Sequence, residues 1–196
     1  AKGGIVVASD AEGMAALTMS ALAERTGAVK PVVYEHFENS EAVAVALMDD
    51  YVQRLTSFVV AKVKVAQTIY EYIDILVDAL FDFQSKEHFH LRCVTNGLTS
   101  NFVNINRVHG EYHKMSVNVF KSLLRQQGIE RDASHVAAFA IHEMLSGTVY
   151  EFSSKALERA ARRTLKSAIK GIVLGLMTQG GAKPVTPMNL LGPRTR

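Results

Sequence analysis

The sequence predicts an all-α protein in which a small N-terminal helical head precedes a larger helical bundle. Two observations lead to this fold class. Apolar residues recur every three or four positions over long segments, which is the period of an amphipathic helix, and no run shows the alternation typical of strands. Hydrophobic residues also make up 48% of the 196-residue chain, which suffices for a sizeable core.

The head contains the most distinctive local pattern, the stretch 17–37. It is expected to form two short helices, with Thr18 or Ser20 capping the first and Gly27 ending it. Pro31 suits the first turn of the second helix, where a missing N–H costs little. Two short helices around a glycine-containing turn predict a helix-turn-helix, although an ordinary hairpin in an all-α core has the same pattern.

Helical spacing, polar caps and glycine stops predict the other helices. They are expected over residues 2–14, 41–65, 68–85, 87–98, 108–127, 133–153 and 158–179. Asn39 or Ser40 is expected to cap the second of these, and Asp132 or Ser134 to open the sixth. The expected domains are a helix-turn-helix DNA-binding domain (1–45), a helical ligand-binding and dimerisation domain (46–180) and a flexible tail (181–196).

Within the head, the run AERTGAVKPVVYEHFENSEAV resembles the signature of the TetR (tetracycline-repressor) family of transcription regulators. The positions in register with that signature are Leu17, Thr18, Ala23, Gly27, Lys30, Pro31, Tyr34, His36 and Phe37. The rest of the chain matches the family only in length and helical character. The resemblance implies a DNA-reading head, a ligand-binding helical body and a homodimer.

By this resemblance, ten residues of the head are expected at DNA: Thr18, Met19, Ser20, Val29, Lys30, Pro31, Val32, Tyr34, His36 and Ser40. Lys30 can reach a guanine edge or a phosphate, and Val32 a thymine methyl group. The Tyr34 hydroxyl is expected at the DNA backbone while its ring packs inside the head. Ser20 and Ser40 stand where the family commonly has an arginine and a lysine, so binding should be weakened and its salt dependence shallow.

The charge distribution argues against tight DNA binding. Residues 1–45 carry three basic and six acidic side chains, whereas residues 155–196 carry nine basic and one acidic. Neutralising phosphates normally supplies most of the affinity for DNA. A helical ligand-binding dimer whose head binds DNA weakly or not at all therefore stays an alternative. The family usually has a basic segment before the first helix, which residues ahead of Ala1 could supply.

The body carries a candidate small-molecule pocket, expected at Phe81, Cys93, Asn96, His109, Tyr112 and His113. Apolar walls with a few polar groups are typical of such pockets, and equally of an ordinary helical core. The scarcity of charge favours a neutral or weakly polar ligand.

His109 and His113 share a helix face, a spacing that metal ligands can use, with His88 and His90 upstream. Because clustered carboxylates are missing, we predict no metal and no cofactor.

A reader of two DNA half-sites needs two copies of the chain. The resemblance places the dimer interface on the last two helices, at Phe139, His142, Ser146, Tyr150, Leu165, Ile169, Ile172 and Leu176. The alternative is that these stripes close the protomer's own core. Gly171 and Gly175 would allow close helix approach.

The sequence offers no support for catalysis. It lacks a phosphate-binding loop, a dinucleotide fingerprint and a Gly-x-Ser-x-Gly run, and the acidic face of Glu71, Asp74 and Asp78 is expected to be solvated. One cysteine is compatible with the reducing cytoplasm, and no segment is apolar enough to cross a membrane. The sequence therefore predicts a cytoplasmic, ligand-responsive repressor that binds a palindromic double-stranded DNA operator and is not an enzyme.

Overall fold

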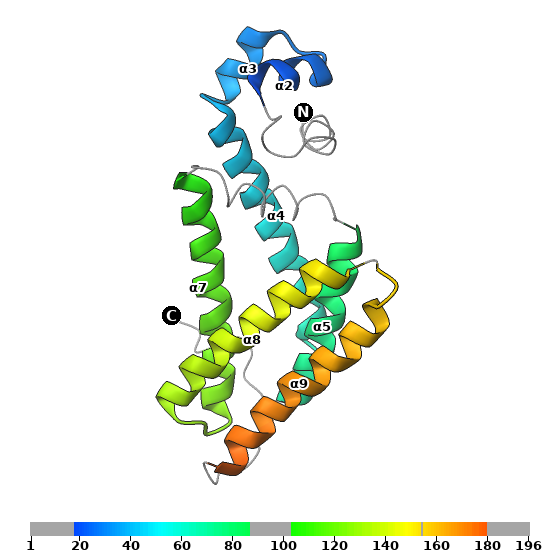
Figure 1. Cartoon of the computed structure of the whole chain (residues 1–196). Coiled ribbons are helices and arrows are strands. Elements are labelled where there is room, and N and C mark those ends of the chain that lie inside the picture. The colour runs from blue at the N-terminus through cyan, green and yellow to red at the C-terminus, as the bar shows by residue number, and fades with distance from the viewer. Residues whose placement is uncertain (1–17, 87–102, 154, 180–196) are drawn as a thin grey trace. The chain divides into compact units, whose positions relative to one another are not determined.

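The computed structural model describes residues 18–86, 103–153 and 155–179 (Figure 1). Its elements are α2 (Met19–Thr26), α3 (Lys30–His36), α4 (Ser40–Val63), α5 (Ile69–Lys86), α7 (Val103–Gln126), α8 (Arg131–Phe152) and α9 (Glu158–Gln179). None of these described residues lies in a strand, so the predicted all-α class is confirmed. The helices expected over 2–14 and 87–98 lie outside the described residues. Within the described ranges, no helix is long and apolar enough to span a membrane.

The chain divides into two compact units. The first comprises Ala1–Arg54 with Glu87–Tyr112, and the second comprises Leu55–Lys86 with His113–Arg196. Helices α4 and α7 therefore contribute residues to both units. The predicted head, residues 1–45, falls within the first unit.

Several helix ends follow the sequence signals. The Asn39 side-chain oxygen accepts the Ala42 N–H at 2.9 Å, so Asn39 rather than Ser40 caps α4. Gly128 ends α7 with φ 80, the left-handed backbone that glycine adopts without strain. Helix α9 begins and ends at the predicted residues.

The start of α8 differs from the prediction. Glu130, and neither Asp132 nor Ser134, is the cap, because its carboxylate accepts the N–H groups of Ala133 at 3.2 Å and Asp132 at 2.9 Å. These two hydrogen bonds hold the pKa of the Glu130 carboxyl below its usual range. Ser134 is buried instead, and its hydroxyl donates to the Ile129 carbonyl at 3.1 Å. The capping carboxylate thus lies two residues before Asp132 and four before Ser134.

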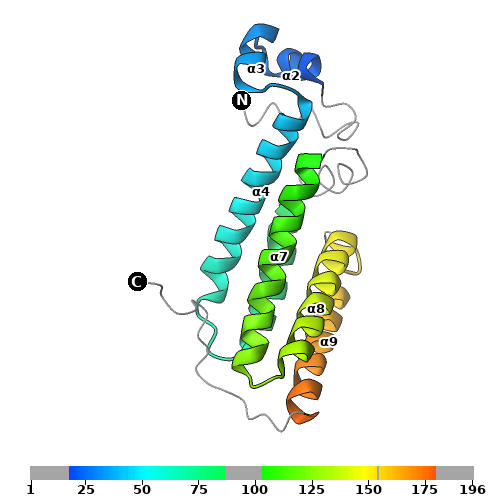
Figure 2. The ribbon, with the colours of Figure 1, turned by 90° about the vertical axis from the view of Figure 1, so that its left-hand side faces the viewer.

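The core of the second unit forms where α5, α8 and α9 pack side by side (Figure 1), and Figure 2 shows α8 next to α9. Its fully buried side chains come from all three helices and from α7, and the largest include Phe81, Ile73, Leu124, Ile141 and Ile169. The predicted apolar stripes of these helices therefore close on one another within the chain. Burial of this kind supplies most of the stability of a helical bundle.

A ladder of opposite charges joins α5 to α9 beside this core. Asp74, Asp78 and Asp82 recur every fourth residue on α5, and Arg162, Lys166 and Lys170 recur every fourth residue on α9. Lys166 Nζ lies 2.7 Å from Asp78 Oδ2, and Lys170 Nζ lies 2.6 Å from Asp74 Oδ2. The side chains of Asp74 and Asp78, which were expected to be solvated, are 41% and 46% exposed and are also paired with lysines of α9. Because the earlier residue on α5 pairs with the later residue on α9, the two helices run antiparallel.

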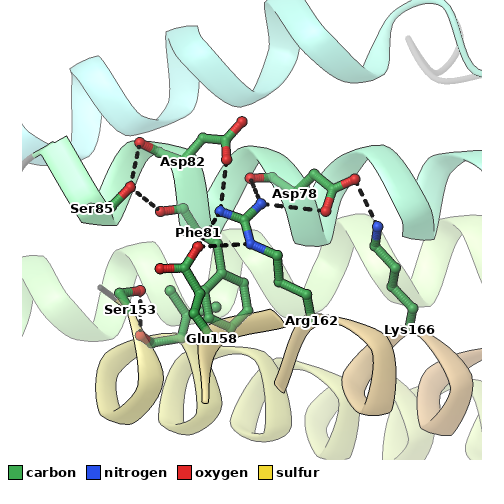
Figure 3. Close-up of polar contacts among 9 residues, drawn as sticks. Asp78, Phe81, Asp82, Ser85, Ser153, Glu158, Arg162 and Lys166 are labelled. Carbon is green, nitrogen blue, oxygen red and sulfur yellow. Dashed lines mark hydrogen bonds and ion pairs between the residues drawn. The ribbon is translucent and has the colours of Figure 1, made fainter. Parts of the chain in front are cut away.

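Arg162 is the most connected member of the ladder (Figure 3). Its Nη2 donates to Glu158 Oε1 at 2.6 Å and to Asp82 Oδ1 at 2.7 Å, and its Nη1 donates to the Asp78 carbonyl at 3.1 Å. The guanidinium also lies 4.9 Å from the ring centre of Phe81. Burial lowers the pKa of Arg162, but the hydrogen bonds to Glu158 and Asp82 outweigh it and raise that pKa.

Removing this guanidinium should destabilise the second unit. Because Arg162→Ala leaves several carboxylate oxygens without their donor, we expect a loss of about 1–3 kcal/mol in the free energy of unfolding. Arg163→Ala is the matched control, since Arg163 is the exposed neighbour on the same helix, and it should change stability by less than about 0.5 kcal/mol. Urea unfolding of both variants checks this, and equal losses would refute a special role for Arg162.

Candidate nucleic-acid interface

The first helix of the predicted helix-turn-helix is α2, and it begins at a side-chain cap. The Thr18 hydroxyl oxygen accepts the Ala21 N–H at 3.1 Å, so Thr18 rather than Ser20 is the cap. Leu22 and Ala23 are buried and form a small cluster with residues of α3 and α4. The α2 helix is thereby fixed by a cap at one end and by this cluster along its inner face.

The turn between α2 and α3 depends on Gly27. Its backbone has φ 68 and ψ 12, in the left-handed region that side chains with a Cβ disfavour. The Gly27 N–H donates to the Glu24 carbonyl at 3.3 Å, and the Ala28 N–H donates to the Ala23 carbonyl at 3.1 Å. These two bonds form a Schellman motif, which reverses the chain direction at the end of a helix. The predicted role of Gly27 is confirmed.

The second helix of the motif, α3, has an inner and an outer side. Val29 precedes the helix with extended backbone, and Pro31 occupies the first turn as predicted. Val33 is 5% exposed and joins the cluster of the first unit. The other predicted DNA-contact residues on and next to α3 are all exposed: Val29, Lys30, Pro31, Val32, Tyr34 and His36.

Two residues of the head differ from the expectation. Met19 is 7% exposed, because its side chain packs in the cluster with Leu22 and Val33, so the side chain is not available at the surface. Tyr34 is 55% exposed, so its ring does not pack inside the head. Val33, one residue earlier on α3, takes that inward position. Helical periodicity allowed either Val33 or Tyr34 to point inward, and in the structure it is Val33 that does so.

The hydroxyl groups predicted to contact phosphates lie at helix starts. Thr18 and Ser20 are exposed at the beginning of α2, and Ser40 is half-buried at the beginning of α4. The first N–H groups of a helix have no partner within it, so these positions combine hydroxyls with backbone donors. Exposed acidic side chains also lie on this unit, at Glu24, Glu35 and Glu38.

The six predicted pocket residues are divided between the two units. His109 and Tyr112 belong to the first unit, whereas Phe81 and His113 belong to the second. Cys93 and Asn96 lie outside the described residues. Phe81 is fully buried in the core beneath Arg162, so its ring serves packing. Burial raises the pKa of the Tyr112 hydroxyl to about 12.

The predicted dimer residues separate into three groups by exposure. The buried ones are His142, Leu165 and Ile169, the half-buried ones are Ile172 and Leu176, and the exposed ones are Phe139, Ser146 and Tyr150. Leu165 and Ile169 lie in the protomer's own core, because α9 packs its apolar stripe against α5 and α8. His142 on α8 is buried beside Ser116 of α7. The side chains of Leu165 and Ile169 thus contribute to the protomer's own core, which was the alternative reading of these stripes.

Large apolar side chains that the sequence did not single out are also exposed on α8 and α9. They include Val136 on α8 and Leu174 on α9. Val136 lies three residues before Phe139, and Leu174 lies between the half-buried Ile172 and Leu176. The sequence could not show that these side chains are exposed, because it does not tell which side of each helix faces the core.

The comparisons with known proteins agree with this geometry. Residues 10–47 match the family model described as bacterial regulatory proteins, tetR family. No curated protein matches the sequence. Among solved structures, the fatty acid degradation regulator FadR from Bacillus halodurans superposes with a TM-score of 0.65 at 20% identity, covering 99% of this chain and 94% of that one.

Two further solved structures share the fold. A TetR-family transcriptional regulator from Streptomyces coelicolor superposes with a TM-score of 0.72 at 13% identity, covering 89% of this chain and 95% of that one. A second one, from Chloroflexus aurantiacus, gives a TM-score of 0.63 at 17% identity, covering 89% of this chain and 90% of that one. The N-terminal segment 10–47 therefore matches the tetR family of bacterial regulatory proteins, and the described helices share the fold of TetR-family transcriptional regulators.

Proposed function

We propose that this protein is a repressor that binds a palindromic operator as a homodimer and releases it when a small molecule binds to the helical body. The observation that carries the proposal is the outer side of α3, where every predicted contact residue is exposed directly after the Gly27 turn. A short helix with free side chains at its N-terminal end suits the major groove. The match of residues 10–47 to the tetR-family model supports the same reading.

Within the groove, some side chains of α3 would contact bases and others would contact the sugar-phosphate backbone. Val29 and Val32 offer methyl groups that can contact a thymine methyl, and Lys30 can donate to a guanine edge or a phosphate. Tyr34 and His36 lie farther along the helix, where an exposed hydroxyl or ring N–H can reach the sugar-phosphate backbone. Sequence selectivity would come mainly from the first three of these residues.

The phosphate contacts would come from hydroxyls and backbone groups at the starts of α2 and α4. The Thr18 oxygen accepts a hydrogen bond from its own helix, so its hydroxyl hydrogen stays able to donate to a phosphate. Ser20 and Ser40 can donate in the same way. Hydroxyl donors release few counterions, and we therefore expect a shallow salt dependence.

Pairing of two copies would use the outer sides of α8 and α9. Phe139 and Tyr150 on α8 and Leu174 on α9 are exposed apolar side chains within one chain. A Cβ added at Gly171 or Gly175 would meet nothing within 4 Å, so these glycines are not required for packing inside the protomer. Small residues on an outer helix side permit the close approach of a second copy.

A link from the body to the reading helix is available within the first unit. The backbone N–H of Asn104, in the first turn of α7, donates to Glu41 Oε1 in the first turn of α4 at 2.7 Å. Met48 on α4 and Val108 on α7 form a separate buried contact. A ligand that moves α7, the helix carrying predicted pocket residues His109 and Tyr112, would therefore move α4 and with it α3.

The acidic head favours a second candidate, a ligand-binding dimer whose head no longer reads DNA. Three basic against six acidic side chains in residues 1–45 oppose phosphate binding.

Replacing Ser20 and Ser40 by the arginine and lysine that the family commonly has at these positions distinguishes the two candidates. We expect the double variant Ser20→Arg, Ser40→Lys to bind DNA from upstream of its own gene about tenfold or more tightly than the wild-type chain. Two added phosphate contacts should also steepen the salt dependence.

Fluorescence polarization over a range of salt concentrations measures both effects. The matched control adds Lys30→Ala to the double variant, which should weaken binding and reduce the salt slope by about one ion. If the double variant shows no detectable binding, the second candidate is correct. If it binds and Lys30→Ala has no effect, α3 is not the reading element.

The dimer proposal makes a separate prediction. We expect Leu174→Glu to weaken self-association by about tenfold or more, because it places a charge at the centre of an apolar contact. Val60→Glu on α4 is the matched control, since Val60 is 51% exposed and Leu174 is 54% exposed. Sedimentation equilibrium gives the dissociation constants. A wild-type monomer, or equal effects of the two substitutions, would exclude this interface.

A further inference from the structure

Three side chains that can bind a metal ion meet in the second unit. His113 comes from α7, and His142 and Glu143 are consecutive residues of α8. One ligand atom from each lies within 4.8 Å of the other two. His113 Nε2 is 3.0 Å from Glu143 Oε1, and the centres of the two imidazole rings are 4.5 Å apart. Two nitrogen donors and one carboxylate thus converge from two helices.

This donor set has a defined chemical preference. Two imidazoles and a carboxylate bind Zn²⁺ at about 2.0–2.2 Å, with a water in the fourth position. Atoms bound to one such tetrahedral ion lie about 3.4 Å apart, so the cluster needs to close by up to about 1.5 Å. Glu143 has a 53% exposed side chain and can make this movement by rotating. Its exposure also gives an ion a route from solvent.

His142 is held in place by two serine hydroxyls. Its Nδ1 is 2.9 Å from Ser116 Oγ on α7, and its Nε2 is 3.3 Å from Ser146 Oγ on α8. Whichever nitrogen binds an ion, the other one keeps a serine partner. Metal-binding histidines commonly have such a second hydrogen bond, which fixes the tautomer and the ring orientation. The buried His142 is therefore already oriented by its surroundings.

The surroundings of His113 are partly apolar. The ring of Phe139 packs against the His113 ring with centroids 5.5 Å apart, which limits water on that side. The His113 side chain is 25% exposed. A semi-enclosed cluster with one open side describes a binding site better than a solvated surface ion pair.

We propose that His113, His142 and Glu143 bind one divalent transition-metal ion, with Zn²⁺ as the best match. The ion joins α7 to α8 and does not depend on the proposed DNA-binding function. The sequence pointed to His113 but paired it with His109 on the same helix. The structure places the partners of His113 on α8, some thirty residues later in the chain.

The test uses the full, untagged chain after dialysis against a chelator. Competition with a chromophoric chelator gives the Zn²⁺ affinity, and elemental analysis after gel filtration gives the stoichiometry. We expect one Zn²⁺ per chain and, in Glu143→Gln, about tenfold or more weaker binding. The Gln side chain keeps the shape of the exposed glutamate, so the fold should be preserved, which circular dichroism verifies.

Matched controls distinguish this cluster from other ligands. His135→Ala removes an exposed histidine of α8 outside the cluster and should leave the affinity unchanged. Co²⁺ in place of Zn²⁺ should give visible absorption bands in the wild-type chain that change in His113→Ala. The proposal is wrong if no stoichiometric metal binds, or if Glu143→Gln and His113→Ala bind Zn²⁺ as tightly as the wild type. It is also wrong if only His88→Ala with His90→Ala abolishes binding.

Discussion

Burial of Val33 is the constraint on which the DNA-reading surface depends. Among the seven residues of α3 it is the buried one, and successive residues of a helix point about 100° apart, so its inward position fixes which side chains point outward. A helix this short has little stability of its own. Its orientation therefore comes from the cluster that Val33 shares with Leu22, Ala23 and Val43. The outward residues of α3 are not needed for this packing and are therefore available for the proposed contacts with DNA.

The left-handed turn at Gly27 makes this burial possible, and it was visible in the sequence. Glycine after an amphipathic run, a proline four residues later and a capping threonine before the run each have a local cause. The same holds for Gly128 after α7 and for both ends of α9. Features set by a few neighbouring residues could be predicted because no distant part of the chain decides them.

The sequence could not predict which partner each apolar stripe meets. Leu165 and Ile169 were expected at a dimer interface and lie in the protomer's own core, because a stripe looks the same whichever helix covers it. Tyr34 was misplaced for a related reason, since a short helix allows more than one inward residue. Met19 was expected at DNA from the family resemblance, and it is buried. Asp74 and Asp78 were taken as solvated, although their spacing matches that of Lys170, Lys166 and Arg162. The register between such distant segments is a tertiary property, and it also brings His113 to Glu143.

The central claim is that the outer side of α3 lies in the major groove of two adjacent half-sites. Dimethyl sulfate protection tests it most directly, because this reagent methylates guanine N7 in the major groove and the bound α3 would shield it. The measurement uses the wild-type chain and a DNA fragment that it selects from a random-sequence pool. We expect two symmetric protected clusters separated by about 10 base pairs or a multiple of that distance. Failure to enrich any sequence, or bound DNA whose guanines stay fully reactive, would contradict the claim.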